Sequence, residues 1–96
     1  MTKEFYETSL NIRARSNIEL ANEVAKYPNL KELNCSESLI TELPLNLNKL
    51  QSLDCSGTPI TKLPPNLNNL KILSCSSTLK IPKYIIRNLG IYINIL

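Results

Sequence analysis

Three Cys-Ser pairs are the residues of this sequence best suited to chemistry, because a thiol can bind metal, form a disulfide or act as a nucleophile. They lie at residues 35–36, 55–56 and 75–76, at a regular spacing of twenty residues. The sequence contains no His, so it offers no Cys-His pair and no Ser-His-Asp triad. A structural zinc site would need four converging ligands. We therefore predict no enzyme activity and no metal or other cofactor.

Disulfides between these cysteines are not expected either. On adjacent parallel strands, neighbouring cysteines lie about 4.8 Å apart, which is more than the ~3.8 Å between Cβ atoms that a disulfide requires. Three is also an odd number of cysteines, and thiols in the cytosol are kept reduced. We therefore predict a column of small, buried, free thiols.

The cysteines recur because the sequence around them recurs. Residues 30–49 and 50–69 share eleven identities in twenty positions, and a third copy begins at Leu70. This third copy loses register and reaches Leu89, a predicted fourth strand opening, after nineteen residues, so that it covers 70–88. Self-similarity at a fixed period indicates a repeat architecture.

The physical basis of the repeat lies in its strand-like opening, where successive side chains point to opposite faces. Leu33 and Cys35 are predicted to face the interior, and Glu32 and Asn34 the outside. One coil buries about six apolar side chains at roughly 2 kcal/mol each, whereas ordering about twenty residues costs at least ~20 kcal/mol of backbone entropy. No coil is therefore expected to fold without its neighbours.

The first two copies carry the pattern Leu-x-x-Leu-x-Cys-Ser, followed by Ile-Thr, Leu-Pro and Leu. This pattern resembles a short leucine-rich repeat, similar to those of bacterial effectors and of large DNA viruses, over residues 30 to about 89. The resemblance implies an α/β solenoid with short parallel strands on a concave face. Pro44 and Pro64 are incompatible with a long return helix, so the convex side is predicted to be extended or built of short turns.

An N-terminal cap is predicted over residues 1–29, ahead of the repeats. Leu10, Ile12 and Ala14 alternate with polar residues, which predicts a short strand one period before Leu30. The first nine residues are mostly polar and predict a loose lead-in to this strand.

A capping box at residues 16–19 predicts the start of a helix in this cap. The Ser16 hydroxyl and the Glu19 carboxylate can each accept from a free backbone N–H of the first helical turn. The helix is predicted over residues 17–26 and should stop before Pro28. Its predicted buried residues are Leu20, Ala21 and Val24.

A C-terminal capping strand is predicted at residues 89–96. One helical turn over residues 84–88 is predicted to bury Ile85 and Ile86, and Gly90 ends it. The alternating residues of the last strand are Ile91, Ile93 and Ile95. Since an exposed hydrophobic edge strand can pair with another chain, two interpretations remain open: a simple terminal cap, or the edge through which a homodimer forms.

The outward side chains of the three repeats form a grid of small, mostly polar groups. The predicted partner-binding residues are Glu32, Asn34, Ser36, Ser52, Asp54, Ser56, Ile72, Ser74 and Ser76. Short polar groups on a rigid scaffold suit hydrogen bonding to another protein, while the serines can equally serve to keep the strand edge hydrated. We therefore predict a module that binds a protein or peptide on its concave face; the alternative is a structural protein that homo-oligomerises through its last strand.

Charge and hydropathy exclude other classes of partner. The net charge of +3, from eleven basic and eight acidic residues, is too small for a nucleic-acid footprint, which needs a dense basic stripe or interleaved aromatics. No segment approaches the ~18–20 apolar residues of a membrane span, and charged residues near the N-terminus are unlike a signal peptide. We expect a cytoplasmic protein, and the similarity to effector and viral repeats implies a host protein as partner.

Overall fold

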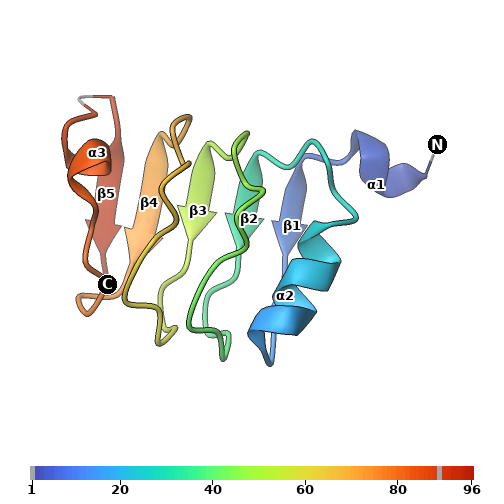
Figure 1. The fold of residues 1–96 in the computed structure, drawn as a ribbon, viewed down its shortest axis with the longest axis horizontal. Coiled ribbons are helices and arrows are strands. Elements are labelled where there is room, and N and C mark those ends of the chain that lie inside the picture. The colour runs from blue at the N-terminus through green and yellow to red at the C-terminus, as the bar shows by residue number, and fades with distance from the viewer. Residues whose placement is uncertain (1, 89) are drawn as a thin grey trace.

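The chain forms a single parallel sheet in the computed structural model, which describes residues 2–88 and 90–96. The strands are β1 (Ser9–Asn11), β2 (Glu32–Asn34), β3 (Ser52–Asp54), β4 (Ile72–Cys75) and β5 (Tyr92–Ile95). Their order across the sheet is their order along the chain (Figure 1). Each turn of the chain therefore adds one strand beside the last, which confirms the predicted α/β solenoid.

Three short helices complete the described part of the chain. They are α1 (Lys3–Tyr6), α2 (Asn17–Val24) and α3 (Lys83–Ile86). Helix α2 lies beside β1 and α3 beside β5, at opposite ends of the solenoid (Figure 1). Residues 35–51 and 55–71 return without a helix, as Pro44 and Pro64 predicted. Among the described residues, no helix is both long and apolar enough to cross a membrane.

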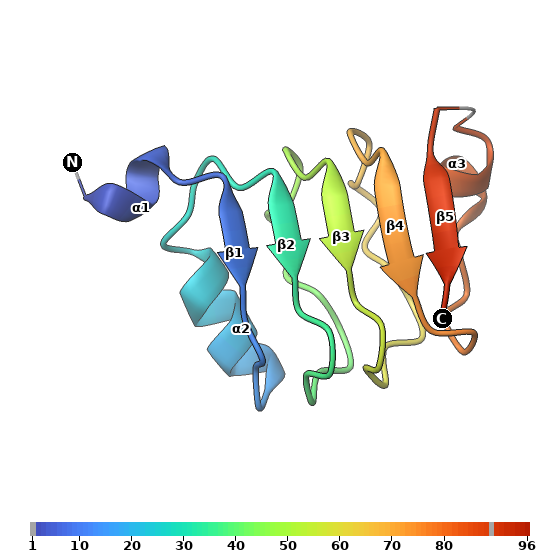
Figure 2. The ribbon, with the colours of Figure 1, turned by 180° about the vertical axis from the view of Figure 1, so that it is seen from behind.

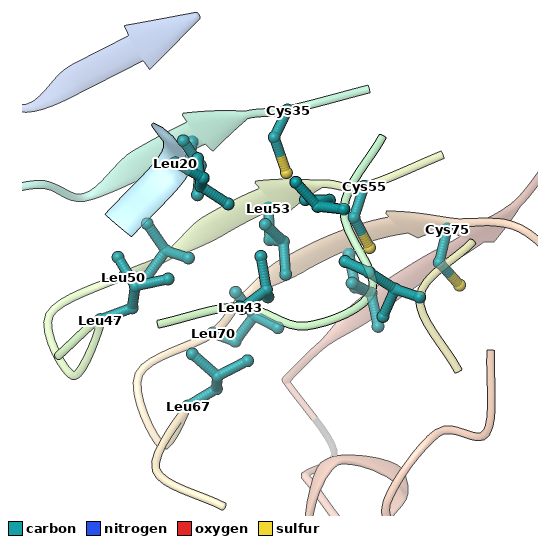
Figure 3. Packing of buried hydrophobic residues seen from close by; sticks show 14 of the residues in the cluster. Leu20, Cys35, Leu43, Leu47, Leu50, Leu53, Cys55, Leu67, Leu70 and Cys75 are labelled. Atoms are coloured by element: carbon teal, nitrogen blue, oxygen red, sulfur yellow. The ribbon is translucent and has the colours of Figure 1, made fainter. Parts of the chain in front are cut away.

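The core consists of columns of side chains that run across the strands. Leu33 lies opposite Leu53, and Leu53 lies opposite Leu73. The three cysteines come two residues further along, at or directly after the ends of β2, β3 and β4, and their side chains lie in one file (Figure 3). All three are buried and free. The period of twenty therefore places like residues in contact, as expected.

The return segments close the core from the other side. Their buried residues are Ile40, Leu43, Leu47 and Leu50 in one coil and Ile60, Leu67 and Leu70 in the next. The third coil departs from this pattern, because Lys80, twenty residues after Ile60, is exposed and Leu79 is buried instead. One residue has been lost in the turn after β4.

The third copy was predicted to span nineteen residues, and this is wrong for the spacing between its strand and the next. The pairing of Leu73 with Ile93 keeps a spacing of twenty, so the residue lost after β4 is regained before β5. The predicted opening at Leu89 falls on a residue outside the described part of the chain.

The first coil is longer than one period. Leu10 pairs with Leu33, twenty-three residues away, so the prediction that β1 lies one period before Leu30 is wrong. The reason is helix α2: a helix advances only 1.5 Å per residue, against ~3.3 Å in extended chain. More residues are therefore needed to return to the sheet.

Helix α2 begins at the predicted residue, Asn17, and of the two hydrogen bonds of the predicted capping box the structure contains the one to Ser16. Ser16 Oγ accepts a hydrogen bond from the Glu19 backbone N–H at 3.1 Å. The helix buries Leu20 and Val24 against the end of the core, while Ala21 is half-buried. It ends at Val24, two residues earlier than predicted.

Helix α3 closes the other end less completely. Ile85 is buried, but the expectation that Ile86 is also buried is wrong, since its side chain is exposed. Adjacent residues of a helix point about 100° apart, so one short turn cannot direct both inward. The hydroxyl of Tyr84 donates to the Pro64 carbonyl at 2.5 Å and ties α3 to the preceding coil.

The turn out of the strand imposes a left-handed backbone on one residue in each of two coils. Glu37 has φ of 60° and Gly57 has φ of 68°, and the two residues are one period apart. This conformation costs a residue with a Cβ about 1–2 kcal/mol, whereas glycine adopts it freely. Gly57 therefore adopts this backbone conformation with less strain than Glu37.

Replacing Glu37 with Gly should raise the free energy of unfolding by about 0.5–1 kcal/mol, because the relief of strain exceeds the extra chain entropy of glycine. Urea unfolding monitored by circular dichroism measures the change. The matched control is Gly57→Ala, which should destabilise, since alanine would have to adopt the same left-handed backbone with φ of 68°. A loss of stability in E37G would contradict the assignment of strain.

Candidate functional site: the open face of the sheet

The file of thiols is the first candidate for chemistry, but its environment opposes reactivity. Burial raises the pKa of Cys35 from 9.0 to about 12, and the charge of Asp54 adds to this shift. Burial also raises the pKa of Cys55 and Cys75. The reactive form of cysteine is the thiolate, so these thiols stay protonated and belong to the core. Among the described residues, no group of three His, Cys, Asp or Glu is placed to hold a metal ion.

The other candidate is the face of the sheet that the return segments and helices do not cover, here called the open face (Figure 2). Its outward side chains form two rows across the strands. The first row is Ser9, Glu32, Ser52, Ile72 and Tyr92, and the second row is Asn11, Asn34, Asp54, Ser74 and Asn94.

Six of the nine residues predicted to bind a partner lie in these rows. They are Glu32, Asn34, Ser52, Asp54, Ile72 and Ser74. The other three, Ser36, Ser56 and Ser76, lie beyond the rows, where the chain leaves the strands. The structure therefore divides the predicted grid into a central part and a rim.

The serines of the rim are occupied within the chain. Asn34 Oδ1 accepts from the Ser36 hydroxyl at 2.7 Å and from its backbone N–H at 3.0 Å. Asp54 Oδ1 accepts from Ser56 at the same two distances. Ser76 Oγ accepts from the backbone N–H of Gly57 at 2.9 Å. These hydroxyls orient neighbouring groups of the open face.

The open face includes residues that the sequence pattern did not single out. A depression of about 380 Å³ extends over β1 to β4, and Ser9 and Asn11 help to line it. These two were missed because the helix in the first coil hides the register of β1. Tyr92 and Asn94 were also missed, although they follow Ile72 and Ser74 by one period.

The two rows carry negative charge. Glu32 and Asp54 are their only charged residues, although the whole chain has a net charge of +3. In the described part of the chain, the ion pairs are Lys3 with Glu7 and Lys26 with Glu23. Neither pair neutralises a carboxylate of the open face.

The C-terminal end of the first row is apolar. Ile72 is 47% exposed and Tyr92 is 65% exposed, and they lie opposite each other on β4 and β5. The first row thus changes from polar and acidic over β1 to β3 to apolar over β4 and β5, while the second row stays polar with Ser74 and Asn94.

Residues 28–66, which contain β2 and β3, match the family Leucine Rich repeats (2 copies). The fold is a leucine-rich repeat solenoid. No curated protein and no solved structure matches the chain. Leucine-rich repeats generally mediate interactions between proteins, and the matched leucine-rich repeats hold both carboxylates of the open face.

The thiols of the leucine-rich repeats predict alkaline sensitivity. Unfolded thiols lose their protons near the ordinary pKa of 9.0, whereas folded Cys35 keeps its proton to about pH 12. Stability that is fully present below pH 9 should therefore be lost between pH 9 and 12. Each thiol can contribute at most about 1.4 kcal/mol per pH unit. Urea unfolding at about pH 8, 9 and 10 measures the slope.

The variant Cys35→Ala is the control for this prediction, because it lacks this thiol and keeps every other titratable group. Its free energy of unfolding should fall less steeply above pH 9 than that of the wild type. Equal slopes would show that Cys35 titrates alike in the folded and unfolded chains.

Proposed function

We propose that the open face binds a protein or peptide and performs no catalysis. The observation that carries this proposal is the exposed pair Ile72 and Tyr92, which lies on β4 and β5 beside the depression lined by residues of β1 to β4. Single exposed apolar residues are common on protein surfaces, but here two lie opposite each other on neighbouring strands. Tyrosine is also enriched among the residues that dominate binding energy at protein interfaces.

The rigidity of the face supports binding by side chains. The backbone groups of β2, β3 and β4 are used by strands on both sides, so a partner meets the outward side chains and not free backbone. These side chains are held in register by the sheet and, at Asn34 and Asp54, by the serines of the rim. A site that is already ordered loses less entropy on binding.

The pair of Ser56 and Asp54 is the closest approach to a catalytic arrangement, since a hydroxyl donates to a carboxylate at 2.7 Å. The same geometry occurs at Ser36 and Asn34, where the acceptor is an amide that cannot act as a base. Ser56 also donates its backbone N–H to the same oxygen. The pair therefore serves as a turn motif.

We also propose a cytosolic location and a host protein as the partner. Free thiols stacked on neighbouring strands suit a reducing compartment. The host partner follows from the resemblance of these repeats to those of effectors and large DNA viruses.

Site-specific photo-crosslinking tests the proposed surface. Glu32 and Tyr92 are replaced one at a time by p-benzoylphenylalanine, and Asn46, an exposed residue of a return segment, serves as the matched control. Irradiation in a lysate of the expressing or host cell should give the same cross-linked product from both open-face positions and not from Asn46. A product from Asn46 alone would overturn the proposal.

A second candidate function is self-association through β5. Strand β5 pairs with β4 on one side, where Tyr92 N–H donates to the Lys71 carbonyl and Leu96 N–H to the Cys75 carbonyl. The alternation of a parallel ladder directs the intervening backbone groups to the outer edge. Ile91 and Ile93 pack partly against the core, whereas Ile95 and Leu96 are 57% and 67% exposed.

Light scattering at micromolar concentration separates these two functions. If β5 pairs with a second copy, the wild type should have the mass of a dimer, and Ile95→Lys should restore the monomer by placing a charge on the edge. Ile18→Lys is the control, since Ile18 is equally apolar and exposed but lies on α2. A monomeric wild type would exclude self-association and leave the open face as the binding surface.

A further inference from the structure

Two carboxylates of the open face each lie two strands away from an exposed apolar side chain. Asp54 on β3 lies two strands from Tyr92 on β5, and Glu32 on β2 lies two strands from Ile72 on β4. Neighbouring strands are about 4.8 Å apart. Glu32 and Ile72 lie in the same row and are therefore about 10 Å apart. Asp54 lies in the second row and Tyr92 in the first, so this pair is diagonal and about 12 Å apart.

Asp54 is the better defined of the two carboxylates. In the described part of the chain, its hydrogen bonds come from Ser56 and both end on Oδ1. This arrangement fixes the orientation of the carboxylate and leaves Oδ2 to accept from a bound group. Because no ion pair of the described residues includes Asp54, a cation from a partner would meet an uncompensated charge.

The apolar pair at the end of the first row complements this charge. Ile72 and Tyr92 present aliphatic and aromatic surface beside each other, and the two rows contain no Lys or Arg that would repel a cation. Covering these side chains would remove apolar surface from water and thereby favour binding. Charge supplies selectivity and apolar contact supplies affinity.

On the basis of the proposed function, we infer that the open face recognises a segment that carries a cationic and an apolar side chain about 10 Å apart on one side. The cation pairs with Glu32, and the apolar side chain packs on Ile72 and the neighbouring Tyr92. Asp54 supplies a second carboxylate on the adjacent strand. The segment crosses the strands. A polyproline II segment rises about 3.1 Å per residue with three residues per turn, so its residues i and i+3 meet this spacing.

Two synthetic peptides test the inference by fluorescence anisotropy. The probe is a fluorescein-labelled proline-rich peptide in which Leu and Lys alternate every third position, and its partner has Glu in place of each Lys. The Lys peptide should bind about tenfold or more tightly than the Glu peptide, the scale of a hydrogen bond to a charged group. This preference should shrink as salt rises.

The structure itself provides a conservative variant. Asn34 makes the same two serine hydrogen bonds as Asp54, so Asp54→Asn should keep the fold and remove only the charge. The double variant Glu32→Gln with Asp54→Asn should lose the preference for Lys over Glu. Tyr92→Ala should weaken binding of both peptides alike, and Glu42→Gln, on a return segment, should change neither.

Three outcomes would overturn the inference. They are a preference for the Glu peptide, a preference for Lys that survives in the double variant, and no binding of either peptide up to about 1 mM, the limit of weak recognition. The photo-crosslinking experiment distinguishes a failure of the inferred basic segment from a failure of the proposed binding face. A partner that cross-links to Glu32 and Tyr92, yet binds the double variant as well as the wild type, retains the binding face and excludes the basic segment.

Discussion

Each coil of this protein depends on contact with the coils beside it. About twenty residues contribute too few apolar side chains to offset their own conformational entropy, so Leu33, Leu53 and Leu73 must stack to form one interior. The file of thiols has the same cause, since a small side chain is needed at the same place in every repeat. The stability of a solenoid therefore lies in the interfaces between its repeats.

This dependence makes the two ends of the solenoid unlike its middle. At the N-terminal end, α2 covers the core with Leu20 and Val24. At the C-terminal end, α3 buries only Ile85 and leaves Ile95 exposed. The C-terminal end is consequently the less completely covered part of the described chain, and the exposed apolar side chains of β4 and β5 gather there.

The period of the sequence was sufficient to predict the solenoid, its parallel strands and the columns of the core, because stacking repeats the same environment every twenty residues. The prediction of register failed in two coils. Helix α2 makes the first coil longer than twenty residues, and in the coil after β4 the turn is one residue shorter and a later segment one residue longer. For the open face, the period identified Glu32, Asn34 and Asp54. It could not show that the Ser36 hydroxyl donates to Asn34 and the Ser56 hydroxyl to Asp54, since these hydrogen bonds depend on the geometry of the turn.

The equivalence of Asn34 and Asp54 has a consequence for how such a surface can diversify. Both side chains accept the same two hydrogen bonds through Oδ1, so the exit from the strand tolerates an amide or a carboxylate without rearrangement. A single exchange between these residues alters the local electrostatic potential while leaving the scaffold intact. Partner preference in this architecture is thus free to evolve independently of folding.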